Sequence, residues 1–437
     1  MQRKDSKMEI YTRVKISKTN KILIILLVLL PIINQYAIGP FTFLELFSFV
    51  VFVREVIVRK ELEIKGLFGI YIGYVVLITI AALFYTSTIQ DVGISTIALR
   101  LVKFVIVMIT FYCIIPNKIN LEYLMKIYTY VVHTVSIVLF LQYLLYLVTG
   151  QGTMFLIPNM TLNYNNGINS SDFMSSTLGR IFTGYYYRPC SVFVEPAYQV
   201  VFVLPWMALK MFNKESKSMS RFDYFMLLIV TSSLLLTTST TALIICLVLW
   251  WIFIARALRT GGKMAKRIWS LVPLIIIAVV WLAQQSGLIT SIVIKMNSLS
   301  NIRQYSSLTL RLLRGIECYR QENLFVQLFG CGYGNITQYF SNIQMHTMYD
   351  GSITDIAYMS GFFTMLCSVG LFGSAILIVY LIKIVRRGKG VVTILFICWF
   401  LMMISSSCFD GDTYLLLIAL MTFCMKDNSN NKSVRIN

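Results

Sequence analysis

Long stretches without charge are the feature that most constrains what this sequence can fold into. The segments 66–85, 127–148 and 359–382 contain no acidic or basic residue except one histidine, and an α-helix needs about 20 apolar residues to cross roughly 30 Å of hydrocarbon. Of the 437 residues, 57% are hydrophobic and 13% are charged, with a mean hydropathy of +0.74. These values indicate a chain that is solvated by a bilayer. We therefore expect an all-α, polytopic helical bundle that forms one membrane-embedded domain, 1–437.

Hydropathy and turn residues together predict about twelve transmembrane helices. We expect them at 22–38, 41–58, 66–86, 97–115, 123–148, 191–212, 222–238, 240–255, 268–286, 356–382, 390–407 and 413–425. The apolar block 222–255 is interrupted only by a run of Thr and Ser at 237–241. We interpret this block as two helices that meet at a polar turn, because one long helix would change the number of spans.

The basic residues orient the predicted helices. Lys and Arg concentrate in the cytoplasmic loops of membrane proteins, and both termini are cytoplasmic in the orientation that places most of the 38 Lys and Arg inside. The exceptions are Arg100, Lys103, Arg180, Arg188, Lys295, Arg303, Arg311, Arg314 and Arg320. This orientation predicts that two long polar loops, 149–190 and 287–355, are extracytoplasmic. Loops of this length usually carry function.

Several classes of function are excluded by what the sequence lacks. No predicted cytoplasmic loop is long enough for a nucleotide-binding domain, and there is no glycine-rich phosphate loop followed by Lys and Ser or Thr. ATP-driven pumps and enzymes that use cytoplasmic nucleotide sugars are therefore excluded. The nine cysteines include no CxxC pair and there are two histidines, so we expect no metal site and no cofactor. We expect no nucleic-acid partner either.

The first long loop ends in a basic, aromatic segment that leads into a helix. Arg180, the tyrosines at 185–187 and Arg188 precede Glu195 and Pro196, which stand where the helix would begin. Proline suits a first helical turn and a carboxylate suits the positive end of the helix dipole, so one interpretation of Glu195 is purely structural. The other is that Glu195, in an ion pair with Arg188, belongs to a sugar-binding or acid–base site at the membrane surface.

The second long loop contains a predicted amphipathic helix. Apolar residues recur at three- and four-residue steps over 302–319, while Arg303, Arg311 and Arg314 lie on the opposite half. We expect this helix to lie in the membrane interface, with its apolar side buried and its arginines at headgroup depth. There they bind either lipid phosphates or a substrate diphosphate, for which the planar guanidinium is well suited.

Two further sets of residues on the predicted outer side are candidates for anion binding. Arg100 and Lys103 lie at the outer end of their span, where they either bind substrate or extend to the interface as long basic side chains do. The run Gly330–Gly334 either wraps its backbone amides around an anion or forms a simple turn.

His346 is the predicted catalytic base. It is the only histidine outside a predicted span, in a loop that also contains Asp350 and Asp355, and an imidazole is the usual general base near neutral pH. By contrast, we interpret His133 and Glu45 as packed or hydrogen-bonded core residues of their helices.

Some of these motifs resemble those of the Wzy-type oligosaccharide repeat-unit polymerases. Arg188 to Pro196 (RPCSVFVEP) resembles the family's Arg-x-x-Gly-x-Phe-x-Glu-Pro signature, with Ser191 in place of its glycine. The segment 328–335 is similar to a glycine-rich element of the family, 239–242 to its Ser-x-Thr-Gly turn, and 361–373 to a span that ends in Gly-Leu-x-Gly. The similarity covers roughly residues 180–382. An Arg-x10-Gly pair found in some members is absent.

The resemblance implies a glycosyltransferase of the bacterial plasma membrane that lengthens capsule, exopolysaccharide or O-antigen chains. Such an enzyme moves a glycan from undecaprenyl diphosphate to the non-reducing end of the next lipid-linked repeat unit, outside the cytoplasm. Its implied partners are the undecaprenyl-diphosphate-linked oligosaccharide, the lipid bilayer, a chain-length regulator and a flippase.

Under this hypothesis His346 and Glu195 are catalytic, and the diphosphate and glycan are bound by Arg188, Arg180, Arg303, Arg311, Arg314, Arg100 and Lys103. Two other hypotheses remain, namely a related O-antigen ligase-type transferase and a lipid-linked oligosaccharide flippase.

Overall fold

A computed structural model of the chain describes residues 17–58, 60, 62, 64, 66–85, 94–163, 169–181, 187–212, 219–260, 307–347, 351–352, 359–405 and 410–433. Within these ranges the protein is almost entirely helical, as expected for an all-α membrane protein. Five helical stretches of the described chain are long and apolar enough to cross a bilayer: Gly66–Phe84, Ile94–Lys118, Leu121–Thr149, Thr241–Arg259 and Gly361–Gly388.

The helices follow the predicted spans. They are α1 (Lys18–Ile33), α2 (Phe43–Phe52) with the π-helix η1 (Val53–Val58), α3 (Gly66–Tyr85), α4 (Ile94–Ile109) with η3 (Thr110–Ile114) and α5 (Ile115–Lys118), α6 (Leu121–Thr149), α8 (Pro196–Phe212), α9 (Arg221–Leu236), α10 (Thr240–Thr260), α16 (Gly361–Gly388), α17 (Val391–Ser405) and α18 (Asp412–Ser433). Each predicted span therefore corresponds to a helix, except 268–286, which lies outside the described residues.

The polar turn between α9 and α10 is confirmed. Ser220 caps the beginning of α9, and its side chain accepts a hydrogen bond from the backbone N–H of Asp223 in a capping box. At the other end the Thr237 hydroxyl donates to the carbonyl of Leu234 at 2.6 Å, and Thr238 has a φ of 52°. A left-handed residue at this position ends the helix, so two helices replace one long one.

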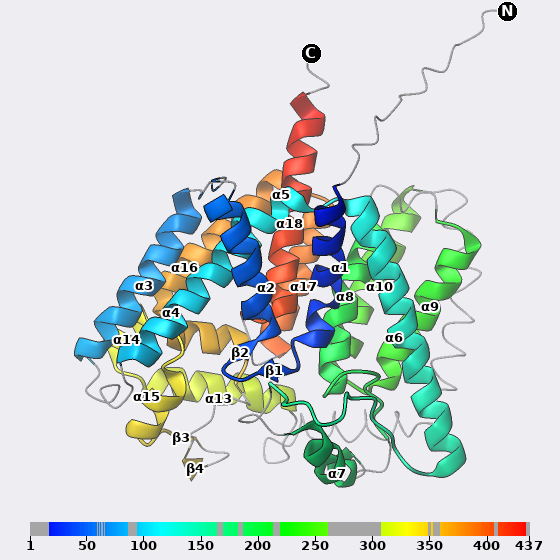
Figure 1. Cartoon of the computed structure of the whole chain (residues 1–437), viewed down its shortest axis with the longest axis horizontal. Coiled ribbons are helices and arrows are strands. Elements are labelled where there is room, and N and C mark those ends of the chain that lie inside the picture. The colour runs from blue at the N-terminus through cyan, green and yellow to red at the C-terminus, as the bar shows by residue number, and fades with distance from the viewer. Residues whose placement is uncertain are drawn as a thin grey trace, which may run out of the picture.

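The helices pack side by side, and the connections between them divide into two ends (Figure 1). α1 begins and α18 ends at one end of the bundle. At the opposite end lie the described parts of both long loops, and we call this the loop end. Its elements are the hairpin β1 (Ala37–Ile38) and β2 (Phe41–Thr42), α7 (Ser170–Ile181), α13 (Ser307–Gln321), α14 (Leu324–Phe329), α15 (Ile336–Asn342), and the hairpin β3 (His346–Thr347) and β4 (Gly351–Ser352).

The run Gly330–Gly334 docks into a break in α16. At the break Gly370 has a φ of 68°, and the amides of Cys331 and Gly332 donate to the carbonyls of Cys367 and Ser368 of α16, each at 2.9 Å. A Cβ on Gly370 would lie 2.4 Å from the backbone of 328–330, closer than real Cβ atoms approach. The two amides therefore bind the protein's own backbone and not an anion.

The side of the amphipathic helix that faces the protein differs from the predicted one, while its place in the membrane interface stays a prediction. In α13, Arg314 is only 6% exposed and Cys318 is 1% exposed, so the side that carries these residues faces the protein. The cause is Gly315, where a Cβ would come within 2.4 Å of the Phe363 ring of α16. A residue without a side chain lets α13 approach α16 on that side, and Arg314 is buried on the same side.

Candidate functional site

A cavity of about 420 Å³ lies at the loop end, between the α1–α2 connection, α4, the beginning of α8 and the beginning of α18. It is lined by three basic side chains, Arg100, Lys103 and Arg311, and by four carboxylates, Glu45, Glu195, Asp410 and Asp412. Apolar residues of α4 and α8 complete the lining. We call this space the charged cavity. It brings together predicted site residues from segments that are far apart in the sequence.

Gln142 of α6 holds the loop that leads to Glu195. Its Oε1 accepts hydrogen bonds from the amides of Cys190 (3.2 Å) and Ser191 (2.7 Å), and its Nε2 donates to the carbonyl of Ser191 at 3.1 Å. Gln142 is fully buried, so these bonds replace those that water would make. Ser191 has a φ of 56°. This is a conformation that favours glycine, the residue that the resembled signature has at this position.

Gln35, which follows α1, holds the next part of the same loop. It donates from Nε2 to the carbonyl of Val192 at 2.7 Å and accepts from the amide of Val194 at 2.9 Å. Glu195 follows directly and precedes Pro196, the first residue of α8. Two buried glutamines from different elements thus fix the backbone that presents Glu195 to the charged cavity.

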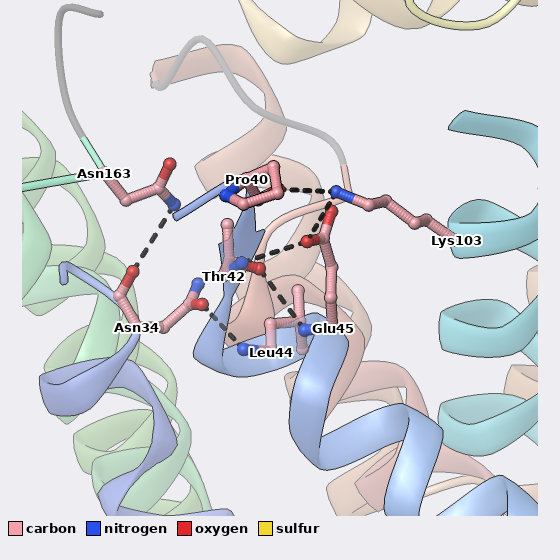
Figure 2. Close-up of polar contacts among 7 residues, drawn as sticks. All are labelled: Asn34, Pro40, Thr42, Leu44, Glu45, Lys103 and Asn163. Carbon is pink, nitrogen blue, oxygen red and sulfur yellow. Dashed lines mark hydrogen bonds and ion pairs between the residues drawn. The ribbon is translucent and has the colours of Figure 1, made fainter. Parts of the chain in front are cut away.

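Lys103 is already neutralised by neighbouring groups (Figure 2). Its Nζ lies 2.9 Å from Oε2 of Glu45, donates to the carbonyl of Pro40 at 2.7 Å, and sits 4.6 Å from the centre of the Phe41 ring. Glu45 also accepts from the amide of Thr42, in the capping box that begins α2. Glu45 is hydrogen-bonded, as expected, but it also lines the cavity. Lys103 therefore ties the β1–β2 hairpin to α4.

Asn34 connects three segments at the rim of the same cavity. Its Oδ1 accepts from the amide of Leu44 at 2.8 Å, and its carbonyl accepts from Nδ2 of Asn163 at 3.4 Å (Figure 2). On the other side, Asn34 Nδ2 donates to Oδ2 of Asp412 at 3.0 Å. The first long loop, α2 and α18 are thereby joined by one residue.

Arg100 and Arg311 keep donors for a ligand. Nη1 of Arg100 donates to the carbonyl of Gly334 at 2.8 Å, and Nη1 of Arg311 donates to the carbonyl of Ser405. The buried Nε of Arg311 has no hydrogen-bond partner in the described part of the chain. Because a guanidinium has five N–H donors, each arginine that binds one backbone carbonyl can still bind an anion in the cavity.

Asp410 is a cavity carboxylate that the sequence analysis did not single out. The hydroxyl of Tyr333, in the glycine run, donates to its Oδ2, and the Tyr333 ring packs 4.4 Å from that of Phe104. Burial raises the pKa of Asp410, and the hydrogen bond from Tyr333 offsets part of this effect. The only signal in the sequence is the pair of acids at 410 and 412, directly before a predicted span.

Two predicted site residues lie elsewhere. Arg188 donates from Nε to the carbonyl of Thr237 at 3.4 Å. The ion pair expected between Arg188 and Glu195 stays a prediction. Arg314 is buried in α13 and does not line the charged cavity.

Three others have side chains that the structure does not describe. Arg180 is in α7 and His346 begins β3, where it pairs with Ser352, and Arg303 lies outside the described residues altogether. Of the predicted set, the charged cavity thus contains Glu195, Arg100, Lys103 and Arg311.

The charged cavity combines groups that suit transfer of a glycosyl group from a diphosphate. Arginines can neutralise a leaving diphosphate, and an adjacent carboxylate can take a proton from a hydroxyl. In the described part of the chain, no three His, Cys, Asp or Glu side chains are grouped so as to hold a metal ion. No protein-family model, curated protein or solved structure matches this chain.

Proposed function

We propose that this protein polymerises undecaprenyl-diphosphate-linked oligosaccharide repeat units on the extracytoplasmic face of the bacterial plasma membrane. In this proposal the chain spans the membrane about twelve times, with both termini in the cytoplasm. The observation that carries the proposal is the charged cavity, in which Arg100 and Arg311 meet Glu195 and Asp410 at the loop end of a membrane bundle.

The arginines bind the diphosphate of the donor. When the acceptor hydroxyl attacks the first carbon of the glycan, the bond from that carbon to the phosphate oxygen breaks, and its electron pair leaves with the diphosphate. Two guanidinium groups that already stand in the cavity stabilise this charge without reorganising. The donor carries its own leaving group, so no nucleotide is required.

A side chain on the loop end accepts the proton of the attacking hydroxyl. The sequence predicts His346 as the base and Glu195 as the catalytic residue that positions the donor, with the reversed roles as the alternative. Glu195 lines the charged cavity beside Arg100 and Arg311, and we therefore assign it as the base, with His346 as the alternative. Asp410 has a raised pKa and a tyrosine donor, which suits it to hold the acceptor through hydrogen bonds.

The lipid-linked pool of a deletion strain tests this function. Without a polymerase, single repeat units should accumulate on the outer leaflet, and a plasmid-borne wild-type copy should restore long chains. Single repeats that stay on the inner leaflet would indicate a flippase instead. Long chains that accumulate on the lipid carrier, without transfer to lipid A core, would indicate a ligase.

A further inference from the structure

A second cavity, of about 210 Å³, lies at the end of the bundle opposite to the charged cavity. It is formed by the beginning of α3, by η3 and α5, by the last turns of α16 and by the middle of α18. Lys383, Arg387 and Lys426 line it together with Asn117 and a group of aromatic residues. We call it the basic cavity. Nothing in the proposed transfer reaction uses it.

The positive charges of the basic cavity are not balanced by its own lining. None of the described lining residues is acidic. Lys383 and Arg387, one helical turn apart on α16, have no side-chain partner in the described part of the chain, and Asp427 is exposed and does not line the cavity. The neighbouring Lys118 is different, because its Nζ is 2.8 Å from the buried Glu55. Like charges one turn apart repel each other, so an anion that bridges them would stabilise the helix end.

One wall of the basic cavity is a cluster of packed aromatic rings. Phe68 stacks on Tyr112 with ring centres 4.2 Å apart, and Tyr380 lies within 6 Å of both rings. Exposed apolar residues continue outward on the two flanking helices, with Ile70 of α3 58% exposed and Ile382 of α16 37% exposed. A ligand that fits such a site has a compact anionic head and an apolar tail.

We propose that the basic cavity binds the phosphoryl headgroup of an anionic membrane lipid. Lys383, Arg387 and Lys426 contact the phosphate, and the tail lies along the exposed residues of α3 and α16. Arginine and lysine at this depth are the usual partners of lipid phosphates. The proposal does not depend on the polymerase assignment, because no residue of the charged cavity takes part.

Thermal unfolding of the purified full-length chain in nanodiscs tests the proposal. Phosphatidylglycerol should raise the Tm of the wild type relative to phosphatidylcholine, because a ligand that binds only the folded state stabilises it. Arg387→Gln should lose most of this increase and bind the lipid about tenfold more weakly, as expected for loss of a charge-assisted hydrogen bond. Arg386→Gln is the matched control, since Arg386 is adjacent, exposed and outside the lining, and it should behave as wild type.

Three results would overturn the proposal. The first is a wild-type Tm that is equal in both lipids, a comparison that needs no variant to fold. The second is that Arg386→Gln and Arg387→Gln lose the lipid-induced increase in Tm equally, which would indicate unspecific attraction between the basic helix end and anionic lipid. The third is an equal increase with inorganic phosphate in phosphatidylcholine nanodiscs, which would assign the site to a free anion. If Arg387→Gln does not fold, Lys383→Gln takes its place with the same expected loss.

Discussion

Arg311 and Lys103 line the same cavity but differ in what neutralises them. Lys103 is held by the carboxylate of Glu45 and by a hairpin carbonyl, whereas the Nε of Arg311 is buried without a partner in the described chain. A buried cation without a partner is costly. Of the two residues, Arg311 is therefore the one that a bound anion would stabilise more. Lys103 mainly stabilises the contact between the β1–β2 hairpin and α4.

Replacement of Arg311 by Lys should reduce polymer yield at least about tenfold, because the charge remains but the bidentate geometry is lost. Protein level, checked by immunoblot, should stay the same. Arg320→Lys, in the last turn of the same helix but outside the cavity lining, should retain wild-type yield. Full yield in Arg311→Lys would contradict the assignment of this arginine to the diphosphate.

Glu195→Gln should lower the rate of chain extension roughly 100-fold or more, the effect expected when a general base is removed. Lipid-linked single repeats should still accumulate. The chain-length distribution of the polymer on a gel measures the effect. His346→Ala is the comparison. If His346→Ala stops extension while Glu195→Gln makes long chains, the imidazole is the base and the carboxylate only positions the donor.

Glu322, between α13 and α14, should make the stability of the protein depend on pH. Burial raises its pKa from 4.5 to about 8, and the Cys367 thiol offsets part of this effect. The folded state therefore holds the proton more tightly than the unfolded state. The contribution of protonated Glu322 to the free energy of unfolding is complete below about pH 4.5. It falls as the pH rises and is lost above about pH 8.

Glu322→Gln should remove this dependence, so the variant should have the higher Tm at about pH 8 and a flatter profile below it. Differential scanning fluorimetry of the purified protein across this range measures the effect. Glu122→Gln, which replaces an exposed carboxylate, should reproduce the wild-type profile. A Glu322→Gln profile that parallels the wild type would show that this carboxyl does not titrate in the window.

At the scale of elements, hydropathy predicted where helices occur but not how they break or which side they bury. The break in α16 depends on contact between Gly370 and Gly330, which are far apart in the sequence, and no local pattern encodes that contact. The side of α13 that is buried depends on Gly315, where a Cβ would meet the Phe363 ring of α16, and a hydropathy pattern does not encode that contact.

The candidate site too could be predicted from the sequence only in part. Glu195 and the arginines could be found from residue type and position, because isolated charges at the edge of apolar segments are conspicuous. Asp410 and the cavity role of Glu45 could not, because they depend on Tyr333 and Lys103, which other elements supply.

Gly370→Ala should destabilise the protein by at least about 2 kcal/mol, because the residue has a positive φ and its Cβ would meet the backbone of 328–330 at 2.4 Å. A lower Tm, and a lower yield of folded protein on size-exclusion chromatography, would measure the destabilisation. Gly73→Ala of α3 is the control, since nothing lies within 4 Å of its Cβ position and alanine favours a helix. A Tm in Gly370→Ala equal to that of the control would contradict the tight backbone contact.

At the scale of the molecule, the two cavities lie at opposite ends of one bundle. The described parts of both long loops contribute to the lining of the charged cavity. The basic cavity lies beside α5, at the end of the bundle where α1 begins (Figure 1). If the loops 149–190 and 287–355 are extracytoplasmic, the transfer chemistry and the lipid-headgroup site act on different leaflets.

Cysteine labelling in intact cells tests this orientation. Gln151→Cys, in the exposed beginning of the first loop, should react with a membrane-impermeant maleimide, whereas Lys389→Cys, exposed after α16, should react only after lysis. The parent chain supplies the background, since seven of the eight described cysteines are buried. Labelling of Lys389→Cys in intact cells would reverse the topology and the proposed side of the reaction.

The docking of 330–334 into α16 also determines which parts of the protein can move separately. Because the amides of Cys331 and Gly332 complete the hydrogen bonding of α16, this stretch of the second loop cannot lift away without leaving helix carbonyls unsatisfied. Tyr333 and the carbonyl that holds Arg100 belong to the same stretch. We therefore expect any tilt of the part of α16 that precedes Gly370 to move one wall of the charged cavity with it.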